Sequence, residues 1–240
     1  MQIRIRRYHV IGLAALLPLA SAFYRKTPKA KALNEPADPV KVLAAVPEPA
    51  ARPDGKSIAL TFDDGPHPQY TERILDILKQ YQVPCTFFLV GKQVERYPDL
   101  VRKIFREGHE IENHTYSHRD LRTLSKSELS NELEKTGDLV KSITAQKMKY
   151  FRPPGGHYNA AVVKIAGDLG YKMALWTVFP KDHSNPPLRL IQERILKNSH
   201  GNEVVLLHSG IENTLKALPD LITSLRKEGF RFVRLSENGP

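Results

Sequence analysis

The stretch Leu60-Thr61-Phe62-Asp63-Asp64-Gly65-Pro66 ends a short apolar run with two adjacent carboxylates. The run before them, residues 57–62, has the length and composition of a buried strand, and the Gly-Pro pair favours a turn directly after it. Asp63 and Asp64 are therefore expected together at the carboxyl end of this strand. Two carboxylates this close repel each other unless a cation, a metal ion or a shared proton stabilises them. The alternative is structural, because an Asp in such a place also forms Asx turns and helix N-caps.

Apolar runs of strand length alternate with segments of helical period between residues 56 and 235. The expected strands are 57–62, 84–90, 110–113, 150–152, 172–178, 203–208 and 231–235. The expected helices are 70–82, 98–107, 125–143, 159–169, 188–198 and 214–227. This alternation predicts an α/β protein with a parallel sheet, and seven even repeats most simply close into a barrel. In such barrels the chemistry collects at the carboxyl ends of the strands.

Local signals mark several ends of the expected helices. Gly108, Gly170 and Gly229 each follow a helical segment, at the position where a left-handed residue commonly ends a helix. Ser125 followed by Glu128 predicts a capping box. These signals support the helix boundaries independently of the apolar period.

Polar groups stand at the ends of five expected strands. They are Asp63-Asp64 after the first, Asn113-His114-Thr115-Tyr116-Ser117-His118 after the third, Arg152-Pro153-Pro154-Gly155-Gly156 after the fourth, Pro180-Lys181-Asp182-His183 after the fifth, and His208 at the end of the sixth. Because parallel strands end at the same edge of a sheet, these groups are expected to meet in one site.

His114 and His118 are four residues apart, a spacing that can turn both imidazoles to one side. The spacing alone is a weak signal, because surface histidines often fall at this distance. With an Asp from a neighbouring strand end, the pair becomes a two-His, one-carboxylate set that leaves positions open for water and substrate. His67, His109 and His157 also follow strand or helix ends, and we expect them to be solvated or to lie behind the site.

These motifs resemble those of the polysaccharide deacetylases, the carbohydrate esterases of family 4 with a NodB homology domain. The resemblance covers roughly residues 56–235 and rests on five motifs in the same order. They are Thr61-Phe62-Asp63-Asp64-Gly65, His114-Thr115-Tyr116-Ser117-His118, Arg152-Pro153-Pro154-Gly155, Trp176 through Asp182, and Leu206-Leu207-His208. The resemblance implies a distorted (β/α) barrel with seven strands, in agreement with the pattern of strands and helices.

The resemblance also implies catalytic and metal-binding roles. Asp63 would act as general base and His208 as general acid. Three residues would bind one divalent metal ion: Asp64, His114 and His118. Imidazole and carboxylate ligands suit zinc, our first choice, and also cobalt, nickel or iron.

Further residues are expected to support or contact the reacting groups. Arg152 would orient Asp63 and keep it ionised, and by the same logic Asp182 would keep His208 protonated.

The remaining matches concern the substrate. The resemblance implies that the Gly155 N–H contacts the oxyanion. Trp176 and Leu206 suit the acetyl methyl group and a sugar face, although plain core packing explains them equally well. Many family members have Asp and Trp where this chain has Phe179 and His183, and Tyr where it has Gly155. These departures bear on substrate fit and rate more than on reaction type.

The first 55 residues carry signals unrelated to the barrel. An Arg-rich start, an apolar stretch and Ala20-Ser21-Ala22 predict a secretory signal peptide over residues 1–22, with an uncleaved anchor as the alternative. The apolar stretch, about 14 residues long, is short for a membrane span of roughly 20. Residues 23–55, rich in Pro, Ala and Lys, are expected to form a disordered linker. The catalytic domain would then occupy residues 56–235, followed by a tail at 236–240.

Composition limits the class of partner. The net charge of +10 favours anionic surroundings, with solubility as the alternative explanation. Aromatic residues are not interleaved with basic clusters, so no nucleic-acid partner is expected. Cys85 is the single cysteine of the chain, which excludes an internal disulfide, and its apolar surroundings predict a buried core residue.

The expected function is an exported, metal-dependent N-deacetylase that acts on N-acetylglucosamine residues of peptidoglycan or a chitin-like polysaccharide. It would work as a monomer that is secreted, periplasmic or associated with the cell wall. Membrane contact would come only through the N-terminal segment, if that is retained. One alternative is a non-catalytic module that binds cell-wall carbohydrate. Another is a hydrolase of a different amide, formylated or cyclic.

Overall fold

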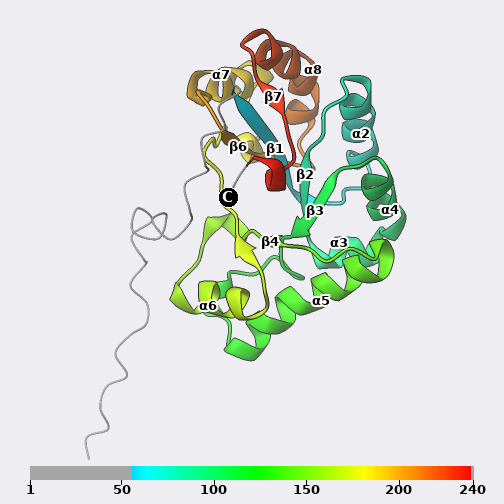
Figure 1. The fold of residues 1–240 in the computed structure, drawn as a ribbon, viewed down its shortest axis with the longest axis vertical. Coiled ribbons are helices and arrows are strands. Elements are labelled where there is room, and N and C mark those ends of the chain that lie inside the picture. Colours follow the sequence, from blue (N-terminus) through cyan, green and yellow to red (C-terminus); the bar gives the residue numbers. More distant parts are fainter. Residues whose placement is uncertain (1–55, 239–240) are drawn as a thin grey trace, which may run out of the picture. The chain divides into compact units, whose positions relative to one another are not determined.

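The expected alternation of strands and helices is present in the computed structural model, which describes residues 56–238 (Figure 1). Its strands are β1 (Ser57–Gly65), β2 (Thr86–Leu89), β3 (Glu110–Asn113), β4 (Tyr150–Phe151), β5 (Lys172–Met173), β6 (Glu203–His208) and β7 (Arg231–Phe232). Its α-helices are α2 (Thr71–Gln80), α3 (Gly91–Arg96), α4 (Pro98–Arg106), α5 (Lys126–Thr144), α6 (Ala160–Asp168), α7 (Leu188–Asn198) and α8 (Glu212–Lys227). The expected signal peptide and linker, residues 1–55, lie outside the described residues.

The strands form one parallel sheet in the order β5-β4-β3-β2-β1-β6, with β7 also paired to β1. Figure 1 shows the helices arranged around the outside of the strands. Because every pairing is parallel, the carboxyl ends of the strands share one edge, and the loops that follow them meet there. The predicted α/β class and parallel sheet are confirmed.

The barrel is not closed by a continuous ladder. The strand expected at residues 172–178 ends as β5 at Met173, and the chain then makes a single bridge, Val178 to Val205 of β6. Part of the cause is a side chain: Arg152 donates to the carbonyl oxygens of Ala174 and Leu175, at 3.1 and 3.2 Å. These carbonyls therefore bond to a guanidinium instead of a neighbouring strand.

The core lies between the sheet and the helices, with β1 at its centre. Ile58, Leu60 and Phe62 of β1 are fully buried, and the Phe62 ring stacks on Phe87 of β2 with centroids 5.4 Å apart. Burying a side chain of this size stabilises the fold by about 1.5–3 kcal/mol. The strand that carries the two carboxylates is thus held rigidly.

The predicted helix caps are found where the sequence places them. Ser125 and Glu128 form the capping box at the start of α5. Gly108, Gly170 and Gly229 have φ angles of 82°, 84° and 86°. Helix α3 was not expected, because its six residues are too few to show a helical period.

His109 is a correction to the expectation of a solvated or supporting histidine. It is 7% exposed, its Nδ1 accepts a hydrogen bond from the Cys85 N–H at 3.3 Å, and its ring packs edge-on against Phe87. Burial lowers the pKa of His109 to about 4. Cys85 is fully buried, as predicted. His109 is therefore a core histidine, kept neutral.

Part of the expected C-terminal tail is packed against the domain. Asn238 is 5% exposed, accepts a hydrogen bond from Ser57 Oγ at 2.5 Å and donates to the Glu203 carbonyl at 3.1 Å. A short 3-10 turn, η4 (Leu235–Glu237), leads into it. The folded part therefore extends at least three residues past the expected end at 235.

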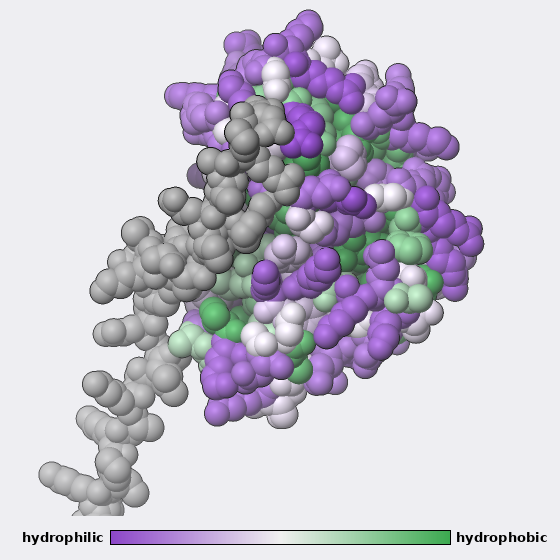
Figure 2. All heavy atoms as spheres, in the orientation of Figure 1, coloured by the Kyte–Doolittle hydropathy of each residue, from purple (hydrophilic) through white to green (hydrophobic). Residues whose placement is uncertain are grey.

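The face of the domain drawn in Figure 2 is mainly polar. Hydrophilic residues predominate on the face drawn in Figure 2, and hydrophobic residues show only in small separate areas. Within residues 56–238, no helix combines the length and the apolar character that crossing a membrane requires.

Candidate active site

A β-bulge at the end of β1 positions Asp63 and Asp64. The register with β2 shifts between Phe62 and Gly65, and Asp64 adopts a left-handed φ of 68°. Successive side chains of a regular strand point to opposite faces, and a bulge re-aims one of them. Both carboxylates consequently approach the same imidazole: His114 Nε2 lies 3.6 Å from Asp63 Oδ2 and 3.4 Å from Asp64 Oδ1.

The loop after β3 supplies the two histidines. His114 is buried, with 2% of its side chain exposed, whereas the His118 side chain is 44% exposed. Two residues of the loop are left-handed, Thr115 with φ 66° and His118 with φ 57°. These turns place both rings on one side, with centroids 5.0 Å apart.

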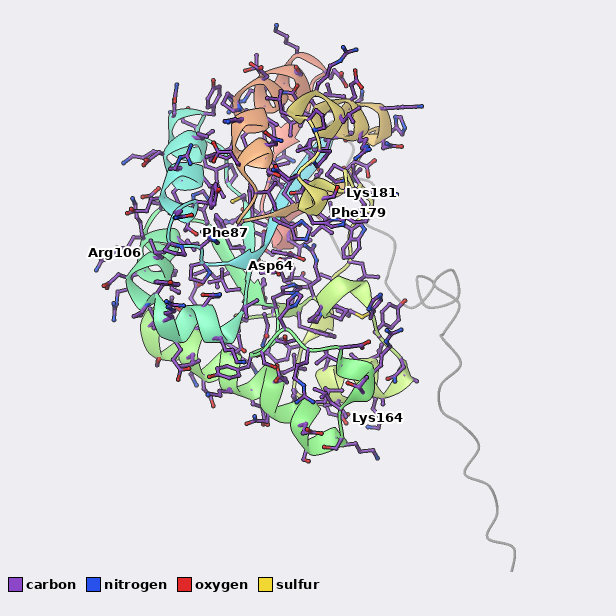
Figure 3. All side chains as sticks on the ribbon, turned by 180° about the vertical axis from the view of Figure 1, so that it is seen from behind. Asp64, Phe87, Arg106, Lys164, Phe179 and Lys181 are labelled. Atoms are coloured by element: carbon purple, nitrogen blue, oxygen red, sulfur yellow. The ribbon has the colours of Figure 1, made fainter. Side chains whose placement is uncertain are left out.

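Asp64, His114 and His118 converge although they are distant along the chain. Each offers a ligand atom, and the three atoms lie within 4.8 Å of one another. Asp64 Oδ1 lies 3.4 Å from His114 Nε2 and 3.2 Å from His118 Nε2. Figure 3 shows Asp64 at the middle of the molecule, where the strands end. The spatial arrangement predicted from the motif spacing is therefore present.

The hydrogen bonds around these three residues fit a divalent cation. His114 Nδ1–H donates to the Arg152 carbonyl at 2.8 Å, so in the neutral ring the Nε2 lone pair faces Asp64. Asp64 Oδ1 is buried and has no hydrogen-bond partner. Lone pairs that face each other in this way suit a shared positive ion, and a histidine ligand fixed through its other nitrogen is the usual arrangement in metal sites.

The charges of the site stabilise the ionised form of Asp64. Burial by itself raises the pKa of the Asp64 carboxyl, but the contacts and charges that His114 and His118 supply when their rings are protonated outweigh it, so the pKa lies far below its ordinary value. Contact with Asp64 in turn raises the pKa of His118, although burial opposes the rise. The carboxylate is thus available as an anionic ligand throughout the physiological range.

Arg152 orients Asp63 from beneath the site. The guanidinium is fully buried and donates from Nη1 to Asp63 Oδ1 at 2.7 Å and to Thr61 Oγ1 at 2.8 Å. Its remaining bonds go to the carbonyls of Ala174 and Leu175. One oxygen of Asp63 is thereby held by an ion pair, and the other, Oδ2, is turned towards His114.

Asp182 and His208 form a second hydrogen-bonded pair next to Asp63, which is in register with His208 across β1 and β6. Asp182 is fully buried, and its Oδ1 lies 2.8 Å from His208 Nδ1. Its other oxygen, Oδ2, accepts hydrogen bonds from the backbone N–H of His208 at 2.8 Å and from Thr214 Oγ1 at 2.7 Å. Burial lowers the pKa of His208, but Asp182 outweighs it and the net pKa is raised. The pair is arranged to keep His208 protonated.

Asp182, His183 and His208 also bring ligand-type atoms within 4.8 Å of one another. In this group the Asp182 and His208 side chains already bond to each other, so the first cluster, whose Asp64 oxygen has no hydrogen-bond partner, is the better candidate for a metal site.

Comparison with known proteins now identifies the family. Residues 50–174 match the family described as polysaccharide deacetylase. The chain belongs to the polysaccharide deacetylase family. It is a hydrolase that acts on carbon–nitrogen bonds other than peptide bonds.

Relatives of this deacetylase include deacetylases of peptidoglycan and of chitooligosaccharides. It is 41% identical over 187 residues to a peptidoglycan-N-acetylglucosamine deacetylase of Bacillus cereus, a match that covers 76% of this chain and 87% of the relative. It is 34% identical over 202 residues to a chitooligosaccharide deacetylase of Rhizobium leguminosarum, covering 78% and 94%.

Solved structures of the family have the same fold. A peptidoglycan N-acetylglucosamine deacetylase in complex with an N-hydroxybenzamide superposes with a TM-score of 0.75 at 36% identity, covering 78% of this chain and 90% of that one. A pseudoenzyme of carbohydrate esterase family 4 from Bacillus anthracis superposes with a TM-score of 0.74 at 33% identity, covering 79% and 68%. The fold is thus shared by relatives with and without activity.

The expected substrate-binding residues of the deacetylase lie in different settings. Gly155 is exposed and left-handed, with φ 61°, in the turn η2 (Pro154–Gly156). Trp176 is half-buried, with its ring 5.7 Å from the Arg152 guanidinium, whereas Leu206 is 3% exposed on β6. Leu206 therefore fits the core-packing alternative better than Trp176 does.

Two of the three departures from the family pattern, Phe179 and His183, lie next to the acid pair. The rings of Phe179 and His183 stack at 5.4 Å, and His183 meets His208 edge-on at 5.6 Å. Phe179 is 38% exposed, and Figure 3 shows it next to Lys181. An aromatic surface therefore borders His208 in this deacetylase.

Sequence reasoning missed two polar residues that hold the site, Thr214 of α8 and Glu132 of α5. Thr214 bonds to Asp182, and Glu132 bonds to the loop that carries the two histidines. Both sit in helices whose local sequence shows only a helical period. The one signal in the sequence is that each of these polar residues falls on the face of its helix that packs against the rest of the domain.

Proposed function

We propose that this chain is an exported, metal-dependent N-deacetylase that removes acetyl groups from N-acetylglucosamine residues of peptidoglycan or a chitin-like polysaccharide. The observation that carries the proposal is the convergence of Asp64, His114 and His118 beside Asp63 and His208. The relatives named above act on peptidoglycan and chitooligosaccharides, which supports this substrate class.

Asp64, His114 and His118 would hold the metal ion. When bound, a divalent ion supplies Lewis acidity, which acidifies water and polarises an amide carbonyl. Two imidazoles and one carboxylate suit zinc, our choice, and also cobalt, nickel or iron(II).

The chain's own groups would move the protons. Arg152 occupies Oδ1 of Asp63, so Oδ2 is the atom that takes a proton from the attacking water. Asp182 occupies Nδ1 of His208, so Nε2 is the nitrogen that gives a proton to the departing amine. The Gly155 N–H is assigned to the oxyanion that forms between these two transfers.

The location and state of the enzyme follow from the substrate. A wall polymer requires export, for which residues 1–22 provide the predicted signal, and we assign the enzyme to the secreted, periplasmic or wall-associated proteins. We expect a monomer, no nucleic-acid partner, and membrane contact only through a retained N-terminal segment.

The test is acetate release from N-acetylated chitooligosaccharide and from peptidoglycan. Asp63→Asn is expected to lower kcat by about 10²- to 10⁴-fold, because it removes the proton acceptor. A chelator is expected to abolish activity, and added zinc to restore it. Asp168→Asn is the control, since Asp168 is an exposed residue paired with Lys164.

A second candidate, a non-catalytic wall-binding module, is favoured by the departures at Phe179, His183 and Gly155 and by the pseudoenzyme relative. Binding to insoluble polymer without acetate release from any N-acetylated substrate would support the module and overturn the deacetylase. Release of formate or opening of a cyclic amide, without acetate release, would instead point to the other amide hydrolases.

A further inference from the structure

The loop that carries His114 and His118 has an unfavourable backbone conformation. Thr115 and His118, neither of them glycine, have left-handed φ angles of 66° and 57°. Such conformations cost free energy and persist only where the surrounding structure determines them. Contacts outside the loop must therefore hold it in place.

Side-chain oxygens accept hydrogen bonds from the backbone N–H groups of this loop. The Thr115 N–H donates to Asn113 Oδ1 at 2.9 Å, and the His118 N–H donates to Thr115 Oγ1 at 3.1 Å. The two N–H groups between them, of Tyr116 and Ser117, both donate to Glu132 Oε2, at 2.9 and 2.7 Å. Asn113 ends β3 directly before the loop, so Glu132 is the one of these acceptors that comes from an element distant in the sequence, helix α5.

Glu132 makes a third bond to the same loop. Its Oε1 accepts from Ser117 Oγ at 2.5 Å, and the residue is only 6% exposed. A buried carboxylate that accepts two N–H groups and a hydroxyl is a strong anchor, because hydrogen bonds to a charged acceptor exceed neutral ones. Glutamine in its place would remove the negative charge and turn its NH₂ group towards Ser117 Oγ, which would then have to accept a hydrogen bond instead of donating one.

We propose that Glu132 is a positioning residue for the metal site. By holding the loop, it keeps the His114 and His118 rings at the distances from Asp64 that a shared metal ion needs, and it thereby determines metal affinity. The inference rests on the metal site of the proposed function. It assigns Glu132 no contact with metal or substrate. Residues that fix metal ligands in this way commonly change metal affinity by about 10- to 100-fold when replaced.

The test is metal affinity, measured by titrating the purified, metal-free full chain with Zn²⁺ and, separately, Co²⁺. Glu132→Gln is expected to raise the Kd by about 10- to 100-fold. Glu134→Gln, an exposed position two residues along α5, is the matched control and is expected to leave the Kd unchanged. A high concentration of free metal is expected to restore the kcat of Glu132→Gln, which loss of a purely structural contact would not produce.

Ser117→Ala tests the same anchor from the loop side if Glu132→Gln fails to fold. It removes one of the three bonds and is expected to raise the Kd about threefold, the effect of a single net hydrogen bond. If both variants fold, their effects are expected to be less than additive, because both act through one anchor.

The outcomes separate this inference from the proposed function. A wild-type protein that binds metal, with a folded Glu132→Gln or Ser117→Ala variant of equal affinity, overturns the positioning role alone. A wild-type protein that binds no divalent ion overturns the metal site and this inference with it.

Discussion

Asp182 accepts its three hydrogen bonds from His208 and Thr214. Because His208 Nδ1 is bonded to this carboxylate, Nε2 is left for proton transfer, and the negative charge of Asp182 raises the pKa of the ring against the effect of burial. At the scale of single residues, this pair offers the clearest link between charge and activity.

The first residue-scale prediction concerns the pH dependence of kcat. A general acid must be protonated, so activity is lost as pH rises through the pKa of His208. Asp182→Asn removes the charge that raises this pKa, so the alkaline limb of the profile is expected to move to lower pH. An unchanged limb in a folded variant would contradict the assignment of His208 as the acid.

The second residue-scale prediction concerns His109 and stability in acid. Burial lowers the pKa of His109 to about 4 from 6.5, so the unfolded chain binds the proton more readily. This difference has no effect above pH 6.5 and destabilises the fold as pH falls from 6.5 to 4, by about 2–3 kcal/mol at pH 4.5. His109→Gln is expected to lose that much less stability between pH 7 and pH 4.5 in urea unfolding. A variant with the same loss as wild type would refute this explanation.

At the scale of elements, the sequence predicts which segments are strands and helices. It predicts less well where a strand bulges or ends early. The bounds of β3, β6 and α7 were predicted as observed, and for β6 and α7 the reason is an apolar pattern that is complete within the segment. The bulge at Asp64 and the early end of β5 were not predicted, since the first depends on a left-handed residue and the second on the guanidinium of Arg152, which follows β4.

The element-scale prediction concerns Gly91, the first residue of α3. A Cβ there would lie 2.5 Å from Thr136 Oγ1 and 2.6 Å from Tyr116 Cδ2, so α3 meets α5 and the histidine loop too closely for a side chain. Gly91→Ala is expected to destabilise the protein by about 1–3 kcal/mol, the usual effect of overpacking. The measurement is the free energy of unfolding in urea.

Gly167→Ala is the control for this comparison. A Cβ at Gly167, inside α6, meets nothing within 4 Å, and alanine is the better helix former by about 0.5–1 kcal/mol. We expect this variant to be as stable as wild type or slightly more stable. Equal stability of the two variants would contradict the prediction, because it would show that the residues around Gly91 accommodate a Cβ with no loss of unfolding free energy.

At the scale of the whole molecule, the site collects side chains from strand ends far apart in the sequence. Parallel strands end at one edge, so the order of strands predicts that His114 and His118 meet an Asp, and the family resemblance identifies that residue as Asp64. Glu132 and Thr214 reach the site from helices α5 and α8, and the local sequence does not predict such tertiary contacts. The incomplete closure between β5 and β6 likewise depends on tertiary contacts.

The central claim is that Asp64, His114 and His118 together bind one divalent ion. The most direct test is a crystal structure of the zinc-loaded protein with anomalous diffraction data collected at the zinc edge. The account predicts one strong anomalous peak, within about 2.0–2.2 Å of an Asp64 oxygen and of a nitrogen of each histidine. A peak at Asp182, His183 and His208 instead, or no peak in the zinc-loaded protein, would contradict it.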